Sequence, residues 1–140
     1  MFISSCTNSD NPSMTTITEK ETKQDSLSGY APVNGLKMYY EIHGKGTPLV
    51  LIHGGGSTLQ TTFGRVLHLF AKSHKVIAVE MQAHGHTADI DRPLSFEQDA
   101  DDIAELLNYL KIDKADVFGF SNGASTTLQL AIRHPRLVNK

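Results

Sequence analysis

The sequence predicts an α/β fold in which a mostly parallel sheet carries helices on both faces. Three observations lead to this prediction. Short apolar runs recur along the chain, as in strands that are buried on both faces of a parallel sheet. Segments with helical spacing of their apolar residues separate these runs. Glycine-containing loops follow three of the runs, at the carboxyl ends of strands, where ligands bind in such sheets.

Four strands are expected along the chain. The first covers residues 36–42, where apolar and polar side chains alternate. Residues 49–52 form a continuous apolar run, and residues 75–80 contain another. The fourth strand is expected at residues 115–120. A turn rich in glycine separates the first two, at residues 44–48.

Three helices are expected between and after these strands. The first covers residues 62–72. It has helical spacing at Phe63, Val66, Leu67 and Phe70. Ser95 is expected to cap the second helix, with Gln98 completing a capping box. That helix is expected to bury Ile103, Leu106, Leu107 and Leu110. The third covers residues 124–133, and Pro135 ends it.

Composition limits the classes of protein that fit. The chain has 140 residues and a formal net charge of −2, which suits one domain with a moderate core. Its 13 basic residues are scattered, so nucleic acid is not an expected partner. No apolar run approaches the roughly 18 residues that a membrane-spanning helix needs. A single cysteine, Cys6, excludes an internal disulfide framework and a cysteine-rich zinc site.

We expect a disordered arm at residues 1–30 and the N-terminal part of a folded domain at residues 31–140. The arm is too polar to offset its ordering entropy by burying apolar surface. Within it, residues 3–6 resemble the end of a bacterial lipoprotein signal, which would make Cys6 a lipid anchor and residues 7–28 a tether. Only five residues precede Cys6, too few for a signal peptide, so we favour an incidental cysteine. The location stays open between cytoplasm and cell envelope.

The most informative stretch is Gly119-Phe120-Ser121-Asn122-Gly123, between the fourth strand and the third helix. A sharp turn at this point forces Ser121 into a strained backbone conformation and exposes its hydroxyl. The neighbours two residues away must then be small, and Gly119 and Gly123 supply the space. The following helix directs backbone N–H groups to the same point. This arrangement suits a serine that attacks a carbonyl.

A second glycine-rich loop, residues 53–56 (His-Gly-Gly-Gly), follows the second strand. Together with Ser121 in its turn, this loop resembles the matching parts of the α/β-hydrolase family. The resemblance implies that Ser121 is the nucleophile. It also implies that the backbone N–H groups of Asn122 and Gly55 form the oxyanion hole, with Gly56 as the alternative to Gly55.

Two further segments carry the same resemblance, which covers residues 33–140. Residues 39–44 resemble the opening of that family's domain. Residues 81–87 resemble its glycine-containing loop after the next strand, although Ala83 and His86 depart from the commonest form. The joint occurrence of these segments, in this order, makes the resemblance specific.

Other polar residues have simpler interpretations. His53 is expected to tie loops together rather than to react. Asp99, Asp101 and Asp102 lie in the first turns of a helix, where a solvated acidic face favoured by the helix dipole explains them. His134 lies at a helix C-terminus, where a cation is favourable, and needs no other role.

A metal site is a competing interpretation of the loop after the third strand. His84 and His86, followed by Asp89 and Asp91, are residue types that ligate zinc. Their spacing misses the H-x-H-x-D-H pattern of metallo-hydrolases by one residue. Residues 53–56 lack the Lys-Ser or Lys-Thr of a nucleotide-binding loop. We therefore expect no metal and no cofactor.

The resemblance implies a serine hydrolase that cleaves a small molecule at an ester-like carbonyl through an acyl-enzyme. In that family the acid and the histidine of the triad follow the nucleophile, and no histidine here occupies the position of the base. We therefore expect a truncated chain, inactive or nearly so alone, and prone to self-association through an unpaired strand edge. The alternative, a non-catalytic truncated paralogue or binding module on the same fold, stays open.

Overall fold

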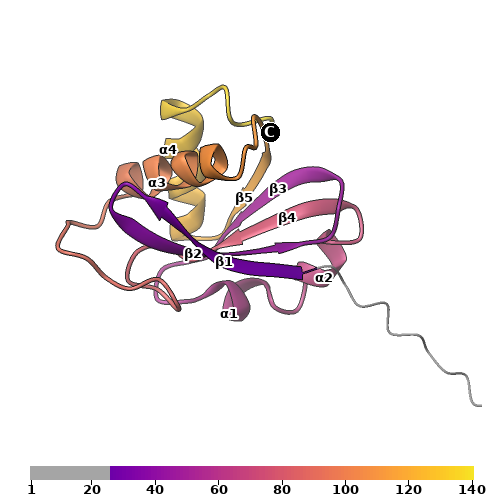
Figure 1. Cartoon of the computed structure of the whole chain (residues 1–140), viewed down its shortest axis with the longest axis horizontal. Coiled ribbons are helices and arrows are strands. Elements are labelled where there is room, and N and C mark those ends of the chain that lie inside the picture. Colours follow the sequence, from indigo (N-terminus) through magenta and orange to yellow (C-terminus); the bar gives the residue numbers. More distant parts are fainter. Residues whose placement is uncertain (1–25) are drawn as a thin grey trace, which may run out of the picture.

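A computed structural model describes residues 26–140 of the chain. Strands and helices alternate after an initial pair of strands, which confirms the predicted α/β class (Figure 1). In chain order the elements are β1 (Ser26–Val33), β2 (Leu36–His43), β3 (Thr47–Ile52), α1 (Leu59–Phe63), α2 (Leu67–Phe70), β4 (His74–Val79), α3 (Phe96–Tyr109), β5 (Asp116–Gly119) and α4 (Asn122–Arg133).

The five strands form one mixed sheet in the order β1-β2-β4-β3-β5. Strands β4, β3 and β5 run parallel, whereas β1 and β2 are antiparallel to their neighbours. A tight turn at Asn34 and Gly35 joins β1 to β2, and both residues have positive φ, 47° and 83°, as the twist of a two-residue hairpin requires. The parallel strands are the ones whose carboxyl ends meet at a common edge.

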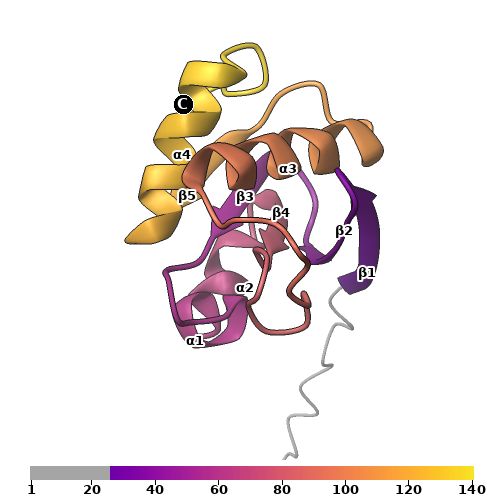
Figure 2. The same ribbon diagram turned by 90° about the vertical axis from the view of Figure 1, so that its left-hand side faces the viewer.

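Helices cover both faces of this sheet, as predicted. Figures 1 and 2 show α3 and α4 on one face and α1 and α2 on the other. Because successive side chains of a strand point to opposite faces, β3 and β4 contribute to two cores. The core under α3 and α4 contains Val50, Ile52, Ile77 and Val79. The core under α1 and α2 contains Leu49, Leu51, Val76 and Ala78.

The predicted helix at residues 62–72 is wrong as a single element, because it is divided into α1 and α2. Gly64 follows the last residue of α1, and the N–H of Val66 then donates to the carbonyl of Phe63 at 2.8 Å. This bond closes a shorter turn than that of an α-helix. Val66 consequently leaves the buried face and is 38 % exposed. Glycine has low helix propensity, so the apolar spacing alone overstated the length of the helix.

The predicted boundary of the N-terminal arm also needs correction. Strand β1 begins at Ser26 and pairs with β2 along its whole length, so the ordered domain starts earlier than residue 31. The first three residues of β1 are exposed, and Leu27 is the one large apolar residue among them, which is why no apolar pattern marked this segment. Cys6 and the rest of residues 1–25 lie outside the described residues. Within residues 26–140, no helix is long and apolar enough to cross a membrane.

The outer edge of β5 is partly paired, contrary to the expectation of an open edge. Ala115 donates its N–H to the carbonyl of Leu137 at 2.9 Å, and Val117 donates to the carbonyl of Lys140 at 3.0 Å. Asn139 donates in return to the carbonyl of Ala115 at 2.8 Å. The last residues of the chain therefore cover the first half of this edge.

Candidate active site

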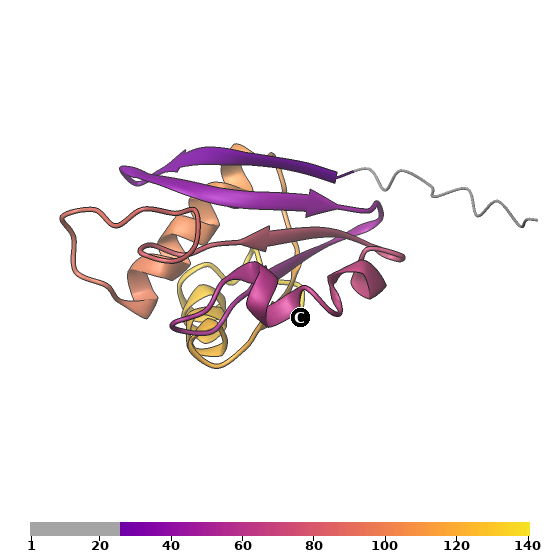
Figure 3. The same ribbon diagram turned by 90° about the horizontal axis from the view of Figure 1, so that it is seen from below.

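Three loops meet at the carboxyl ends of the parallel strands, as the sequence predicts. The N–H of Phe120, after β5, donates to the carbonyl of Ile52 at the end of β3, at 3.0 Å. The loop after β3 is joined to the loop after β4, because Gly56 donates its N–H to His84 Nε2 at 3.2 Å. Figure 3 shows the long segment between β4 and α3 extending beyond this edge of the sheet. Segments distant in sequence therefore converge around Ser121.

Ser121 lies on the turn between β5 and α4, and its backbone has the predicted strain. Its φ is 53° and its ψ is −119°, a combination that costs a non-glycine residue about 1–3 kcal/mol. The side chain is exposed. The first turn of α4 begins immediately after it, since Ala124 donates its N–H to the carbonyl of Ser121 at 2.8 Å. The helix thus starts at Asn122, two residues earlier than predicted.

The two glycines that flank Ser121 have no room for a side chain. A Cβ at Gly119 would lie 2.1 Å from the carbonyl oxygen of Gly123. A Cβ at Gly123 would lie 2.2 Å from the carbonyl oxygen of Ile52. These distances are far below any van der Waals contact, so close approach of β3, β5 and α4 requires glycine at both positions.

Backbone N–H groups of the two loops lie near Ser121. A Cβ at Gly55 would lie 2.2 Å from Nδ2 of Asn122, so the two loops touch at this point. Among the described residues, neither the Gly55 nor the Asn122 N–H donates a hydrogen bond. The N–H of Gly56 is already bound to His84. The backbone N–H groups of Gly55 and Asn122 are therefore free to bind a ligand, whereas that of Gly56 would first have to leave His84.

His53 ties the loops together, which confirms its predicted structural role. It is fully buried, its Nδ1–H donates to the carbonyl of Gly54 at 2.7 Å, and its Nε2 accepts the N–H of Met81 at 3.1 Å. These two bonds require the neutral ring with the proton on Nδ1. Burial lowers the pKa of His53 below its ordinary value, which is consistent with the neutral form.

Both histidines and Asp89 of the competing zinc hypothesis are bonded to separate partners. His84 donates Nδ1–H to the carbonyl of Gln82 at 2.8 Å, while His86 Nδ1 lies 2.9 Å from a carboxylate oxygen of Glu80. Asp89 accepts from the Gln82 amide at 2.7 Å. Across residues 26–140, no three His, Cys, Asp or Glu side chains are grouped to hold a metal ion.

The expectation of a solvated acidic face on α3 is wrong for Asp102. This carboxylate is fully buried and forms an ion pair with Arg92 at 2.6 Å, supported by hydrogen bonds from Asn34 and Gln98. The helix dipole alone did not reveal these partners, because Arg92 and Asn34 lie on other segments. The network fixes the long loop after β4 against α3.

Asp101 and His134 are also paired, contrary to the simple interpretations given to each. Asp101 binds Arg133 at 2.6 Å and His134 at 2.7 Å, and chiefly the hydrogen bond from Arg133 lowers the pKa of Asp101 to about 2. This pairing joins the outer side of α3 to the end of α4. It is a structural contact between helices.

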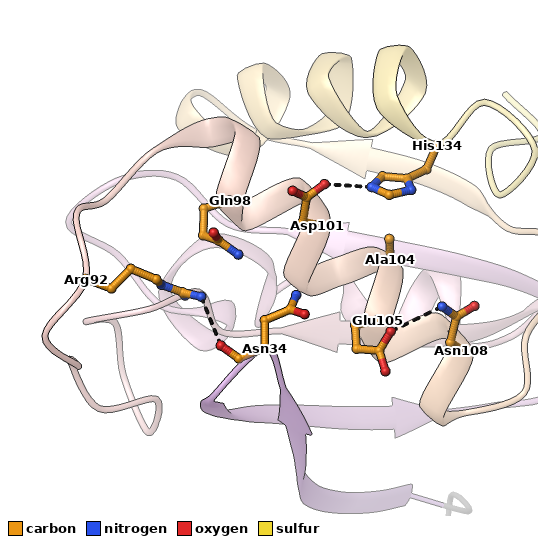
Figure 4. Close-up of a pocket in the computed structure, with 8 residues that line it drawn as sticks. All are labelled: Asn34, Arg92, Gln98, Asp101, Ala104, Glu105, Asn108 and His134. Atoms are coloured by element: carbon orange, nitrogen blue, oxygen red, sulfur yellow. Dashed lines mark hydrogen bonds and ion pairs between the residues drawn. The ribbon is translucent and has the colours of Figure 1, made fainter.

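A cavity of about 530 Å³ lies on this outer side and is not lined by Ser121, Asn122 or the glycine-rich loop after β3. Figure 4 shows its polar side chains bonded to one another, with Asp101 facing His134 and Asn108 facing Glu105. The charged groups that line this cavity are paired with other residues of the protein. We therefore do not include it in the candidate active site.

Two smaller cavities flank the turn. One, of about 440 Å³, is lined by Ser121 and Gly55 and has apolar walls that include Phe63 and Phe118. The other, of about 410 Å³, is lined by Asn122 and by residues of the long loop and of α3. Reading the sequence alone missed both, because their walls come from segments that are far apart in the chain.

The order of elements, the strained serine and the glycine-rich loop can be compared with known proteins. The family model described as alpha/beta hydrolase fold matches residues 47–140, which is more than half of the chain. The chain belongs to the α/β-hydrolase fold family. This result confirms the resemblance inferred from residues 33–140.

Individual relatives of this α/β-hydrolase chain include several named hydrolases. "Serine hydrolase BPHL" of Homo sapiens is 34% identical over 119 residues, which cover 81% of this chain and 40% of that protein. "2-Hydroxymuconate semialdehyde hydrolase" of Pseudomonas sp. (strain CF600) is 34% identical over 112 residues, covering 76% and 38%. The solved structure "Epoxide hydrolase CorEH without ligand" superposes with a TM-score of 0.77 at 29% identity, covering 81% and 40%.

The chain therefore spans about two fifths of the length of these relatives. We call the full natural chain that contains these 140 residues, whatever its length, the whole protein. Membership of the family supports a hydrolase. The roles of Ser121, Asn122, Gly55 and Gly56 stay predictions.

Proposed function

We propose that the whole protein is a serine hydrolase in which Ser121 attacks an ester-like carbonyl and forms an acyl-enzyme. One observation carries this proposal. Ser121 is exposed and has a φ of 53°, on a turn whose flanking glycines admit no side chain. A protein does not maintain such strain without support from the surrounding structure, and strained residues cluster at reactive positions. The similarity to a human serine hydrolase supports the same function.

The chemistry follows from the placement of the loops. The Ser121 oxygen attacks the carbonyl carbon, and its proton passes to a base. The resulting oxyanion accepts hydrogen bonds from the free N–H groups of Asn122 and Gly55, aided by the N-terminal end of α4. The tetrahedral intermediate then collapses and expels the alcohol, which takes the proton from the base. Water attacks the acyl group in the same way and releases the acid.

The base and its acidic partner are proposed to come from the whole protein. Among residues 26–140, no histidine or carboxylate forms a hydrogen bond with the Ser121 hydroxyl. Serine is a weak nucleophile near neutral pH without an adjacent base. In chain order, the family's acid and histidine follow the serine. We therefore expect residues 1–140 alone to show little or no turnover.

A serine at this position also separates the proposal from other chemistry on the same fold. The family resemblance implies a carboxylate nucleophile for the epoxide hydrolases of this family. The solved structure of one epoxide hydrolase is similar to this chain. The side chain of Ser121 is a hydroxyl and not a carboxylate. Its attack on a carbonyl carbon therefore gives an acyl-enzyme. Esters, lactones and related acyl compounds are the substrate classes that fit.

A fluorophosphonate probe, which reacts with activated serines, tests this function. We expect the whole protein to be labelled at Ser121, with labelling lost in Ser121→Ala and unchanged by EDTA. Ser125→Ala is the matched control, since it removes a hydroxyl one turn further along α4 and should still be labelled. Absence of labelling in a folded whole protein would instead favour the non-catalytic binding module.

A further inference from the structure

The cavity beside Asn122 has a chemical character of its own. Its walls are apolar at Met81, Leu94 and Phe96, and two carboxylates of α3, Glu97 and Asp99, also line it. Leu94 and Phe96 are exposed. An apolar cavity with a few polar groups is the common form of a small-molecule site.

Asp99 is a carboxylate of this cavity that is paired with no other group. Within residues 26–140 it accepts no hydrogen bond and forms no ion pair. Burial, and then repulsion from Asp102, raises the pKa of Asp99 to about 6, while His84 and Arg92 offset this only in part. Arg92 is itself bound to Asp102. Asp99 is half-buried, and a partly buried carboxylate that lacks a partner binds a cation or a hydrogen-bond donor favourably.

The rest of the surroundings compensates this negative charge only in part. Among residues 26–140, no lysine or arginine lines the cavity. His84, which does line it, accepts the N–H of Gly56 at Nε2 and donates from Nδ1 to the carbonyl of Gln82. Both of its ring nitrogens are therefore already bonded within the protein. The cavity therefore attracts positive charge and repels anions.

We propose that this cavity binds the protonated amine of the substrate, with the amine paired to Asp99 and the adjoining apolar chain lying against Leu94 and Phe96. The inference rests on the proposed function, because the same substrate presents its carbonyl to Ser121 next to Asn122. It names the substrate class: esters whose apolar chain ends in an ammonium group. Asp99 sets specificity in this scheme and takes no part in bond making.

The kinetic test compares matched substrates in the whole protein. One pair is a p-nitrophenyl ester of an ω-amino acid and the ester of the same length with a methyl group in place of the ammonium. In a second pair of esters, the ammonium or the methyl group stands on the alcohol part instead of on the acyl part. We expect kcat/KM to favour the amine by on the order of tenfold in one pair. Asp99→Asn should reduce this ratio to about one, and Glu105→Gln, an exposed residue of α3 outside the cavity, should preserve it.

A binding test does not depend on the reaction. In the Ser121→Ala background, hexylammonium should bind more tightly than hexanol in a calorimetric titration, and Asp99→Asn should weaken only the ammonium, on the order of tenfold. This inference would be overturned if Asp99→Asn changed neither the affinity for hexylammonium nor the kcat/KM ratio of the matched substrates. If hydrolysis still depended on Ser121, the proposed function would remain intact. Asp99-dependent binding without Ser121-dependent hydrolysis would support the cavity and overturn the function. Asp99→Asn removes an unpaired charge, so an unchanged or higher melting temperature verifies that the variant is folded.

Discussion

The backbone of Ser121 lies in the left-handed region, where serine is uncommon, and the surrounding atoms explain how it is held there. Gly119 and Gly123 approach neighbouring carbonyl groups so closely that neither tolerates a Cβ. The N–H of Phe120 is bonded to β3, and α4 begins directly after the serine. The strain is therefore offset by contacts of three separate elements, and replacement of a single glycine should release it.

Gly123→Ala tests this description of the turn. The new Cβ would lie 2.2 Å from the carbonyl oxygen of Ile52, so the free energy of unfolding of the chain should fall by about 3 kcal/mol. Gly56→Ala is the control. Gly56 also has positive φ, but no atom lies within 4 Å of its Cβ position, so its loss should be only about 1 kcal/mol. Urea unfolding of both variants measures the difference, and equal losses would show that the turn is not closely packed.

Single residues were predicted well where a local motif determined their environment. The strained serine, the glycines beside it and the structural role of His53 all follow from short patterns next to buried strands. Asp102 was misread, because its partners Asn34 and Arg92 are 68 and 10 positions away in the chain. Sequence patterns do not report such contacts, since they depend on how the loops fold back onto α3.

Among the elements, prediction succeeded where the apolar spacing was strong. Helix α3 was expected from its buried stripe, and Ser95 caps it by accepting the N–H of Gln98 at 3.1 Å. The second half of the predicted capping box is absent in this helix, because the Gln98 side chain bonds to Asp102 instead. Strand β1 was missed, since hairpin pairing rather than an apolar pattern holds its first half.

Strand β5 and helix α4 present apolar side chains that the rest of the described chain does not cover. Phe118 is 49% exposed and Phe120 58%, and on α4 Leu128 is 66% and Ile132 71% exposed. Leu128 and Ile132 are four positions apart, so they lie on one face of the helix. Large exposed apolar side chains, grouped as Leu128 and Ile132 are on α4, favour association.

We therefore expect the purified 140-residue chain to self-associate, although residues 137–140 cover part of the β5 edge. Light scattering should show species larger than a monomer, and the pair of changes Leu128→Gln with Ile132→Gln should reduce their size. Gln60→Leu, an exposed position of α1 on the opposite face, provides a contrast that leaves this apolar surface unchanged. A monodisperse monomer of the unmodified chain would contradict the expectation.

At the scale of the molecule, the sheet brings three loops together at one edge and the helices hold them there. The sequence indicated this convergence, because the carboxyl ends of parallel strands meet at one edge. It did not indicate the two cavities beside Ser121 and Asn122, whose walls combine distant segments. Family membership is established over residues 47–140, and the proposed catalysis needs a base and an acid from the rest of the whole protein.

Acylation of Ser121 can be detected by acid quench and mass spectrometry. The whole protein is mixed with p-nitrophenyl acetate, quenched within the first turnover and digested. We expect one acetyl group on the peptide that contains Ser121, formed together with a burst of p-nitrophenol, and neither in Ser121→Ala. Turnover that persists in Ser121→Ala, or an acetyl group carried by a different residue, would contradict acylation at Ser121.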